Sequence, residues 1–272
     1  MYIYLNGSWV EEGEAKISVL DIAILRGFGI FDFLRTYGQN PFRLQDHIDR
    51  FYNSARIMGI KPQFSKEEMR AIITEGIEKN GFENTNIKII QTGGESSDGF
   101  TPAGNSSFFI YFYEAVDYPD KFYQNGIALK TTRLMRQLPE AKSINYGASI
   151  VEVISAAKKG AKDILHTDSQ GNIYEATRSN FFAVKNEKLI TPDKGILMGI
   201  TRKVVLEIAK RLHIDIEYDF PNINEIADFD EVFITSSSYE IMPVVKIDDK
   251  IIGNGKPGVI TKRLHSEYRK GI

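Results

Sequence analysis

The chain has 272 residues, of which 42% are hydrophobic and 26% charged, and its formal net charge is −2. This composition is typical of a soluble globular protein, and the charge gives no support to nucleic-acid binding. The chain contains no cysteine, which excludes disulfides, thiolate catalysis and thiolate metal sites and fits a reducing compartment.

The first part of the chain combines strands with two helices. One helix is expected from Leu44 to about Gly59, because apolar residues recur there at helical spacing. Ser65 and Glu68 form a capping box, which predicts the start of a second helix. Strands are expected at residues 2–5 (turning at Asn6-Gly7), 28–37, 87–91 and 107–114, with a glycine-rich loop at 93–104.

The polar stretch 116–126 is the predicted linker, and a strand-rich part follows it. The expected strands are 127–132, 161–167, 181–184 and 231–235, with a hairpin at 244–252 and helices near 150–157 and 204–212. The order of these elements indicates an α+β or mixed α/β fold with two domains. We expect a small domain at residues 1–115 and a larger mixed-sheet domain at 127–272.

Several common kinds of site have no counterpart in this sequence. There is no phosphate-binding G-x-x-x-x-G-K-[ST] loop, no G-x-G-x-x-G motif and no G-x-S-x-G motif. The four histidines are scattered without the spacing of metal ligands. We therefore expect no metal site.

Two charged residues are candidates for covalent and cofactor chemistry. Lys142 lies in a segment poor in competing charge, where desolvation would expose a neutral amine, although a solvated surface lysine is the commoner explanation. Glu175 precedes the apolar pair Phe181-Phe182, so its carboxylate needs a partner. That partner could be a pyridinium nitrogen, or it could be Arg178 or another cation.

Three further places are candidates for binding an anion. Gly199 to Arg202 opens a helix, and the free backbone N–H groups of such a start, with a hydroxyl beside them, could receive a phosphate. The segment Thr235 to Ser238 is a hydroxyl-rich turn after a buried strand. Arg50 lies off the apolar stripe of its helix and could clamp a phosphate. Each feature alone is more often a capped helix, an ordinary turn or a solvated arginine.

Taken in order, these motifs resemble the class IV aminotransferases, which are fold type IV enzymes that use pyridoxal 5′-phosphate (PLP). This group includes branched-chain aminotransferases, D-amino-acid aminotransferases and aminodeoxychorismate lyases. The resemblance covers nearly the whole chain. The motifs that carry it are Tyr4 to Gly7, Arg26 to Asp32, Phe42 to Leu44, His47 to Arg50, Ser54-Ala55, Lys142 to Tyr146, Gly171 to Glu175, Ser179 to Phe182, Leu189 to Pro192, Ile196 to Arg202, Glu231 to Phe233 and Glu240 to Val244.

The resemblance implies a D-amino-acid-aminotransferase-like fold and a role for each candidate. Lys142 would be the catalytic residue, carrying PLP as a Schiff base and moving the proton. Glu175 would hold the ring nitrogen protonated, and Tyr146 would lie near the phenolic oxygen. The phosphate would bind Arg50, Ile200, Thr201 and Ser237, and the substrate carboxylate would bind backbone N–H groups at Ser237 and Ser238. The family also implies a homodimer in which the small domain of one subunit covers the active site of the other.

The resemblance further implies ping-pong transfer of an amino group between an amino acid and a 2-oxo acid such as 2-oxoglutarate. We favour branched-chain or similar apolar substrates, because Phe31 could line an apolar pocket. The segment Gln91 to Glu95, in which Gly94 would lie beside the substrate, lacks the arginine with which D-amino-acid enzymes bind the substrate carboxylate. Arg178 could pair with the acidic side chain of glutamate. The alternatives are a lyase that releases pyruvate and a non-catalytic binding protein with this fold. We expect a cytoplasmic protein that binds neither membrane nor nucleic acid, because no signal-peptide or membrane-spanning pattern is present.

Overall fold

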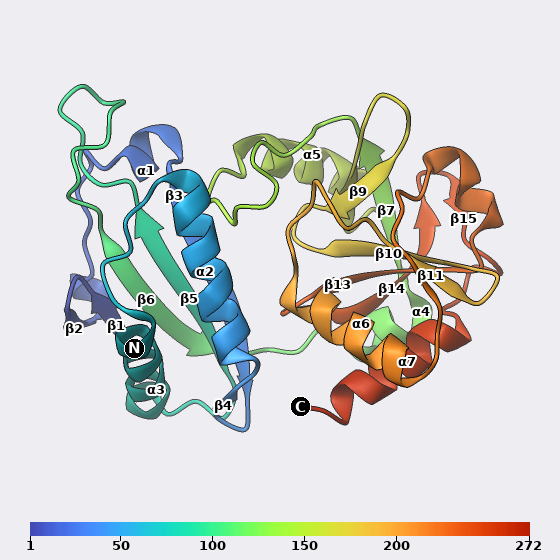
Figure 1. The fold of residues 1–272 in the computed structure, drawn as a ribbon, viewed down its shortest axis with the longest axis horizontal. Helices are drawn as coiled ribbons and strands as arrows, with labels where there is room; N and C mark the ends of the chain where they lie inside the picture. Colours follow the sequence, from blue (N-terminus) through green and yellow to red (C-terminus); the bar gives the residue numbers. More distant parts are fainter. The chain divides into compact units, whose positions relative to one another are not determined.

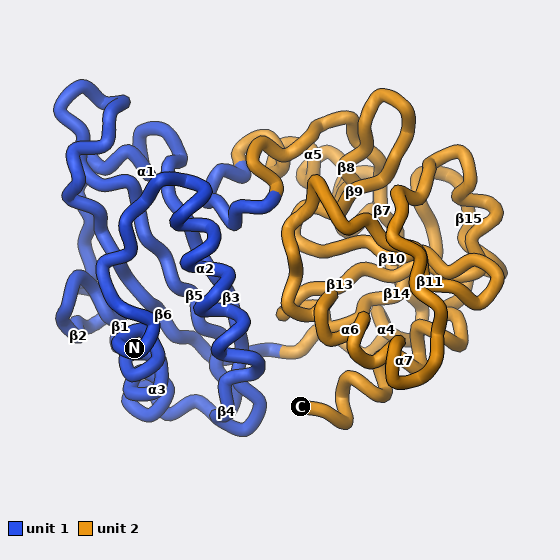
Figure 2. Tube along the Cα trace, in the orientation of Figure 1, with its two compact units in different colours: residues 1–116, 140–146 blue, residues 117–139, 147–272 orange.

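The computed structural model describes residues 1–272, which form two compact units (Figure 1, Figure 2). Unit 1 comprises Met1–Val116 and Glu140–Tyr146, and unit 2 comprises Asp117–Pro139 and Gly147–Ile272. Each unit has its own sheet and its own apolar core. The sequence predicts that Lys142 belongs to the second domain, whereas its segment packs with unit 1. No helix in either unit has the length and hydropathy that a membrane crossing needs.

Unit 1 contains a six-stranded antiparallel sheet in the order β2-β1-β6-β5-β3-β4. Its strands are β1 (Tyr2–Leu5), β2 (Ser8–Glu11), β3 (Gly29–Tyr37), β4 (Asn40–Pro41), β5 (Thr85–Thr92) and β6 (Phe108–Glu114). The predicted strands at residues 2–5, 28–37, 87–91 and 107–114 correspond to β1, β3, β5 and β6, with bounds that agree within a few residues. The hairpin of β1 and β2 turns at Asn6-Gly7, as the sequence predicts, because both residues adopt the positive φ angles that such a turn requires.

Two long helices, α2 (Leu44–Met58) and α3 (Lys66–Asn80), cover one face of this sheet (Figure 1). Helix α2 ends at Gly59, whose φ of 67° is left-handed and suits glycine. Helix α3 begins with the predicted capping box, in which Ser65 and Glu68 exchange side-chain and backbone hydrogen bonds. The shorter helices η1 (Glu12–Glu14) and α1 (Ile22–Arg26) lack a helical periodicity and do not follow from the sequence pattern.

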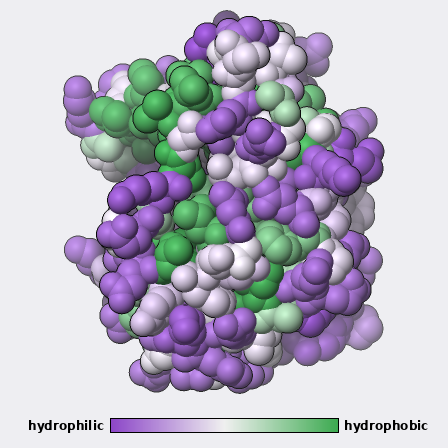
Figure 3. Space-filling model, turned by 90° about the vertical axis from the view of Figure 1, so that its left-hand side faces the viewer, coloured by the Kyte–Doolittle hydropathy of each residue, from purple (hydrophilic) through white to green (hydrophobic).

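Exposed apolar side chains gather around α1 and the loop that follows β5. They are Val19, Leu20, Ile24, Leu25 and Phe100. The two segments are joined by a hydrogen bond from the Ser96 N–H to the Leu20 carbonyl. Figure 3 looks at unit 1 and shows apolar side chains gathered in the upper part of this face. Val19 and Phe100 are each 75% exposed, so this surface is not part of the unit's own core.

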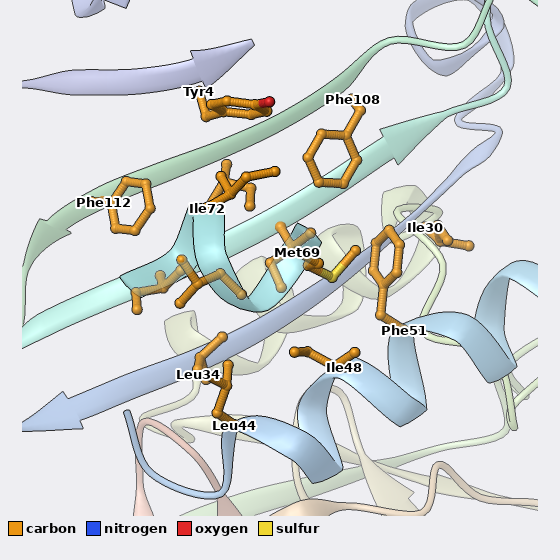
Figure 4. Close-up of a cluster of buried hydrophobic side chains, with 14 of the residues drawn as sticks. Tyr4, Ile30, Leu34, Leu44, Ile48, Phe51, Met69, Ile72, Phe108 and Phe112 are labelled. Atoms are coloured by element: carbon orange, nitrogen blue, oxygen red, sulfur yellow. The ribbon is translucent and has the colours of Figure 1, made fainter. Parts of the chain in front are cut away.

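The core of unit 1 lies between the sheet and its two helices, as Figure 4 shows. Ile48 and Phe51 of α2 and Met69 of α3 are fully buried there. Leu34 of β3 and Phe112 of β6 meet them from the sheet side. This packing fixes α2 against β3, which matters because both elements carry candidate site residues.

Unit 2 contains a nine-stranded mixed sheet in the order β12-β11-β10-β13-β14-β7-β8-β9, with β15 beside β14. Strand β9 also pairs with β10, so part of the strand path closes on itself. The strands are β7 (Ile127–Thr132), β8 (Asp163–Thr167), β9 (Ile173–Ala176), β10 (Asn180–Lys185), β11 (Lys188–Ile190), β12 (Ile216–Glu217), β13 (Glu231–Ser236), β14 (Glu240–Ile247) and β15 (Lys250–Ile251).

The helices of unit 2 are α4 (Asp120–Asn125), α5 (Gly147–Lys158), α6 (Ile200–Arg211), η2 (Ile223–Asp228) and α7 (Val259–Arg269). Helices α5 and α6 and strand β7 match the predicted elements. Helix α4 lies inside the stretch 116–126 that the sequence predicts as a linker, and β9 and α7 are additional to the predicted elements. The mixed helix and sheet content expected from the sequence is confirmed in both units.

Candidate active site

Lys142 is buried in unit 1, and its backbone is held on both sides. The Lys142 carbonyl accepts a hydrogen bond from the Phe31 N–H at 2.9 Å, and the Ile144 N–H donates to the Gly29 carbonyl at 3.1 Å. The Lys142 N–H donates to the Ser54 hydroxyl at 3.0 Å. The side-chain amine lies 4.5 Å from the centre of the Phe31 ring, and the residue is 8% exposed. A charged lysine is rarely buried to this extent, so the amine has the partly desolvated setting that a nucleophile needs.

Arg50 and Tyr146 lie on the same framework as Lys142. The Tyr146 ring packs edge-on against Phe31, with 5.9 Å between ring centres. Ser54, whose hydroxyl accepts from Lys142, donates to the Arg50 carbonyl at 3.0 Å. Within unit 1 the structure thus brings together four predicted site residues, namely Lys142, Arg50, Phe31 and Tyr146.

Gly94 follows β5 and has a structural reason to be glycine. Its φ is +87°, and a Cβ atom there would lie 2.5 Å from the carbonyl carbon of Asn105. Its carbonyl accepts a hydrogen bond from the Ile22 N–H at 2.9 Å, which ties α1 to this loop. The requirement for glycine is therefore explained by the backbone, and a contact with substrate stays a prediction.

Glu175 is 3% exposed on β9 of unit 2, and both of its carboxylate oxygens are paired. Its Oε1 pairs with Arg136 Nη1 at 2.6 Å. Its Oε2 accepts from the Leu197 N–H at 3.1 Å and from the Asn180 amide at 3.3 Å. The cation paired with Glu175 is Arg136, which agrees with the sequence alternative of a cation other than Arg178. Arg136 lies 39 residues earlier in the chain, so no local pattern points to this pair.

The start of helix α6 lies close to Glu175 within unit 2, because Leu197 precedes the helix and binds the carboxylate. Ile200 and Thr201 are buried at 6% and 2% exposure. Gly199 is the N-cap residue, and no side chain caps the helix. The first backbone N–H groups of a helix have no partner inside it and carry its positive end. A buried helix start without a cap is therefore suited to an anion.

The turn that carries Ser237 and Ser238 lies at the same end of the sheet as Glu175. Glu175 pairs with Asn180, and Asn180 pairs with Thr235, so three neighbouring strands place these residues in one row. The turn joins β13 to β14, and the Ser236 and Ser238 hydroxyls are 3.3 Å apart. Ser237 and Ser238 are half-buried. Within unit 2 the structure thus brings Glu175, the start of α6 and this turn to one end of the sheet.

Arg178 occupies the tight turn between β9 and β10, where the Ala176 N–H donates to the Ser179 carbonyl at 2.8 Å. Its side chain is exposed and is held by the Tyr239 hydroxyl, which accepts from Nη2 at 3.2 Å. Burial raises the pKa of Tyr239, although the nearby charge of Arg178 acts in the opposite direction. Tyr239 therefore stays protonated and neutral at physiological pH.

Comparison with known proteins identifies the family. Residues 29–247 match the model of the family described as amino-transferase class IV. A putative branched-chain-amino-acid aminotransferase of Methanocaldococcus jannaschii is 35% identical over 278 residues, covering 99% of this chain and 96% of the relative. The chain belongs to the class IV aminotransferase family. A D-alanine aminotransferase of Staphylococcus haemolyticus is 29% identical, covering 99% of this chain and 97% of the relative.

Solved structures of the family share the fold. The branched-chain amino acid aminotransferase of T.th., solved with pyridoxamine 5′-phosphate, has a TM-score of 0.93 and 30% sequence identity, covering 99% of this chain and 93% of that structure. The two-domain fold type expected from the sequence is thereby confirmed. Class IV aminotransferases depend on PLP, so this chain is a PLP-dependent aminotransferase whose substrates are amino acids and 2-oxo acids.

Taken separately, each unit contains residues that fit this cofactor chemically. The buried hydroxyls of Thr177, Ser179 and Thr235 have no hydrogen-bond partner in the protein. Thr177 and Ser179 lie in the turn that joins β9 to β10, and Thr235 lies on β13 opposite Asn180. Buried polar atoms are ordinarily paired, so their presence indicates a place for a polar ligand. Unit 2 holds a carboxylate for a protonated ring nitrogen and an uncapped helix start for a phosphate, and unit 1 holds a buried amine. Each is a group that PLP requires.

Proposed function

We propose that this aminotransferase transfers amino groups between branched-chain or similar apolar amino acids and a 2-oxo acid such as 2-oxoglutarate, in a ping-pong reaction with Lys142 as the catalytic residue. The observation that carries this proposal is the burial of Lys142, whose backbone is fixed by hydrogen bonds and whose amine lies against the Phe31 ring. The name of the Methanocaldococcus jannaschii relative supports the substrate class.

The chemistry proposed for Lys142 is proton transfer. PLP, when bound, supplies an electron sink that stabilises negative charge on the substrate carbon. Lys142 Nζ would take the proton from the substrate Cα in the neutral form and later return a proton. Its backbone bonds to Phe31 and Ser54 hold the main chain from which the amine extends during both steps. The half-buried ring of Phe31 lies beside the amine and would contact the apolar side chain of the substrate.

The roles proposed for the remaining residues follow their surroundings. Glu175 would accept the hydrogen bond of the protonated ring nitrogen, and its pairing with Arg136 keeps a carboxylate stable in a buried position. Tyr146 would lie near the phenolic oxygen. The cofactor phosphate would bind Arg50, the N–H groups of Ile200 and Thr201, and the Ser237 hydroxyl. Backbone N–H groups at Ser237 and Ser238 would receive the substrate carboxylate.

The choice between apolar L-amino acids and D-amino acids rests on the loop after β5. The residues Gln91 to Glu95 contain no arginine to bind a carboxylate. The backbone of Gly94 is packed against Asn105 and would allow close approach of a substrate without offering a charge. We therefore propose the apolar class and keep D-amino acids as an outcome of the substrate panel.

A half-reaction assay tests this proposal directly. The purified enzyme in its PLP form is mixed with single amino acids, and conversion of the bound cofactor to its pyridoxamine form is followed by absorbance. We expect conversion by leucine, isoleucine and valine and slower conversion by D-alanine. Lys142→Ala should abolish conversion and trapping by borohydride, whereas Lys66→Ala, on the outer surface of unit 1, should leave both intact. Conversion by D-alanine alone would overturn the substrate class.

We propose that Arg178 binds the acidic side chain of glutamate and of 2-oxoglutarate. Its exposed guanidinium has the donors for a carboxylate, and Tyr239 orients it. Arg178→Ala should raise KM for glutamate and 2-oxoglutarate about tenfold, as expected for a lost charged hydrogen bond, and leave KM for leucine unchanged. Tyr239→Phe keeps the charge but releases the orientation, so it should raise the same two KM values less. Unchanged KM for glutamate in Arg178→Ala would show that the assignment is wrong.

We also propose a homodimer. The apolar surface of α1 and its neighbouring loop, with Phe100 and Val19 each 75% exposed, is the kind of surface that a second copy would cover. Sedimentation equilibrium should give twice the mass of the chain, and Phe100→Asp should shift the equilibrium toward monomer. An unchanged mass in that variant would argue against this surface as the dimer interface.

The domain limits at 116–126 and the cytoplasmic location stay predictions.

The pyruvate-releasing lyase receives less support than the aminotransferase. The relatives reported above are named as aminotransferases. Release of pyruvate from aminodeoxychorismate without net amino transfer would favour the lyase.

A further inference from the structure

Asp32 is a fully buried carboxylate on β3 that binds Arg50 along one edge of the guanidinium. Asp32 Oδ2 accepts from Arg50 Nε at 2.9 Å, and Oδ1 accepts from Arg50 Nη2 at 2.9 Å. The exposed fraction of the Asp32 side chain is 0% and that of Arg50 is 9%. Two parallel bonds of this kind fix the plane of a guanidinium, which a single contact would not do.

His47 completes the arrangement from the same helix. It lies three residues before Arg50 on α2, so both side chains face β3. Its Nδ1 is 2.7 Å from Asp32 Oδ1, and an ionised carboxylate only accepts, so Nδ1 carries the hydrogen. Burial alone would raise the pKa of Asp32, but the charges of Arg50 and His47 and their hydrogen bonds lower it well below its usual range. Asp32 is therefore ionised at neutral pH.

We propose that Asp32 is a positioning residue that aims Arg50 at the phosphate of the cofactor. Its two bonds use Nε and Nη2, and Nη1 takes part in neither. Holding one edge of the guanidinium in the protein turns the other edge toward an anion. This inference rests on the proposed function, in which Arg50 binds the phosphate.

The same helix connects this arrangement to Lys142. The Ser54 hydroxyl donates to the Arg50 carbonyl and accepts from the Lys142 N–H, both at 3.0 Å. Strand β3 carries Asp32 and also Phe31, whose N–H binds the Lys142 carbonyl. The guanidinium and the lysine are therefore attached to one pair of packed elements, so Asp32 orients a phosphate-binding group that keeps its place relative to the amine.

The test compares PLP with pyridoxal, which lacks the phosphate. Cofactor-free full-length enzyme is titrated with each compound, and the absorbance of the lysine-bound form gives the two dissociation constants. Asp32→Asn should reduce the preference for PLP over pyridoxal about tenfold, as expected for a lost charged hydrogen bond, and leave pyridoxal affinity within about twofold. Asp49→Asn is the matched control, because Asp49 lies on the same helix and faces solvent toward Lys66. Its preference should equal that of the parent enzyme.

The outcomes separate this inference from the proposal on which it rests. If Arg50→Ala leaves the preference for PLP unchanged, Arg50 does not bind the phosphate, and the proposed role itself fails. If Arg50→Ala removes the preference but Asp32→Asn does not, only the positioning role of Asp32 is wrong. Equal weakening of both compounds, or tighter binding of PLP through lost repulsion, would also overturn it.

Should Asp32→Asn fail to fold, two milder variants keep the test open. Asp32→Glu retains the charge and should retain most of the preference. His47→Gln weakens the hold on the Asp32 carboxylate without removing it. The preference for PLP over pyridoxal should fall about threefold, because part of one hydrogen bond is lost. An unchanged preference in His47→Gln would overturn the proposal.

Discussion

Replacing Ser54 by alanine should loosen the segment that carries Lys142. The Ser54 hydroxyl is the acceptor for the Lys142 N–H, and both residues are buried, at 0% and 8% exposure. Water cannot easily replace this acceptor, so the variant leaves a buried N–H group without a partner. Such a group costs about 1–3 kcal/mol, whereas a group at the surface can exchange its lost partner for water at little net cost. The second bond of Ser54, to the Arg50 carbonyl, is lost as well.

Urea unfolding at fixed, saturating PLP measures this cost, because cofactor binding otherwise changes the apparent stability. The matched control is Thr74→Ala on α3, which removes an exposed hydroxyl that contacts only the carbonyl four residues earlier, at Arg70. We expect Ser54→Ala to lose about 1–3 kcal/mol and the control to stay within about 0.5 kcal/mol. If the two variants were indistinguishable, the Ser54 hydroxyl would not be what holds Lys142.

Three further predictions concern the scaffold. Glu231→Gln should lower the free energy of unfolding in urea by about 2 kcal/mol, because the carboxylate accepts hydrogen bonds from the Ile260 and Thr261 N–H groups and the Thr261 hydroxyl of α7. The control Glu187→Gln, at an exposed position, should have no effect. Gly94→Ala should lower the melting temperature more than Gly104→Ala, because both have a φ near +90° but only Gly94 has the Asn105 backbone 2.5 Å from a new Cβ; equal losses would contradict the clash. Burial alone would raise the pKa of Glu240, but hydrogen bonds from His265 and Arg269 lower it to about 2. The stability that the Glu240 carboxylate contributes should therefore be present above pH 4.5, the ordinary pKa of the group, and be lost as the pH falls toward 2. Glu240→Gln should flatten the fall of the unfolding free energy over this acid range.

The elements that follow from sequence are those with a strong local signal. Helices α2 and α3 have apolar residues at helical spacing, and Gly59 and the pair Ser65 and Glu68 mark their ends, so both were predictable. Strand β9 has four residues and α1 has five, which is too short for a periodicity to develop.

Periodicity also identifies a face without saying what covers it. The apolar residues of α5 predict a helix, and α5 is a helix. Yet Ile150, Val151 and Ile154 are each more than half exposed, so they are not buried in the core of unit 2. A stripe of apolar residues at helical spacing reports that a face is apolar, and only tertiary contacts decide whether the same chain buries it.

The candidate site shows the same contrast between residues that a local pattern identifies and partners that only the fold brings close. Lys142, Glu175 and Arg50 could be named from the sequence, because each lies in one of the ordered motifs through which the chain resembles this family. Their partners could not, since Arg136 reaches Glu175 across 39 residues and Ser54 reaches Lys142 across 88. Buried ionic and polar groups are satisfied wherever folding brings a donor, which sequence separation does not predict.

The division into units gives those long-range bonds a specific consequence. Lys142 follows the predicted linker in sequence, yet its hydrogen bonds to β3 and α2 make it part of unit 1 together with Arg50. Glu175 and the start of α6 belong to unit 2 and are joined to each other through Leu197. Ser54→Ala, which removes the hydrogen bond to the Lys142 N–H, should therefore disturb the position of Lys142 while leaving the geometry around Glu175 intact. Amide hydrogen exchange distinguishes the two, because faster exchange after Ser54→Ala should be confined to residues 140–146 and their contacts on α2 and β3.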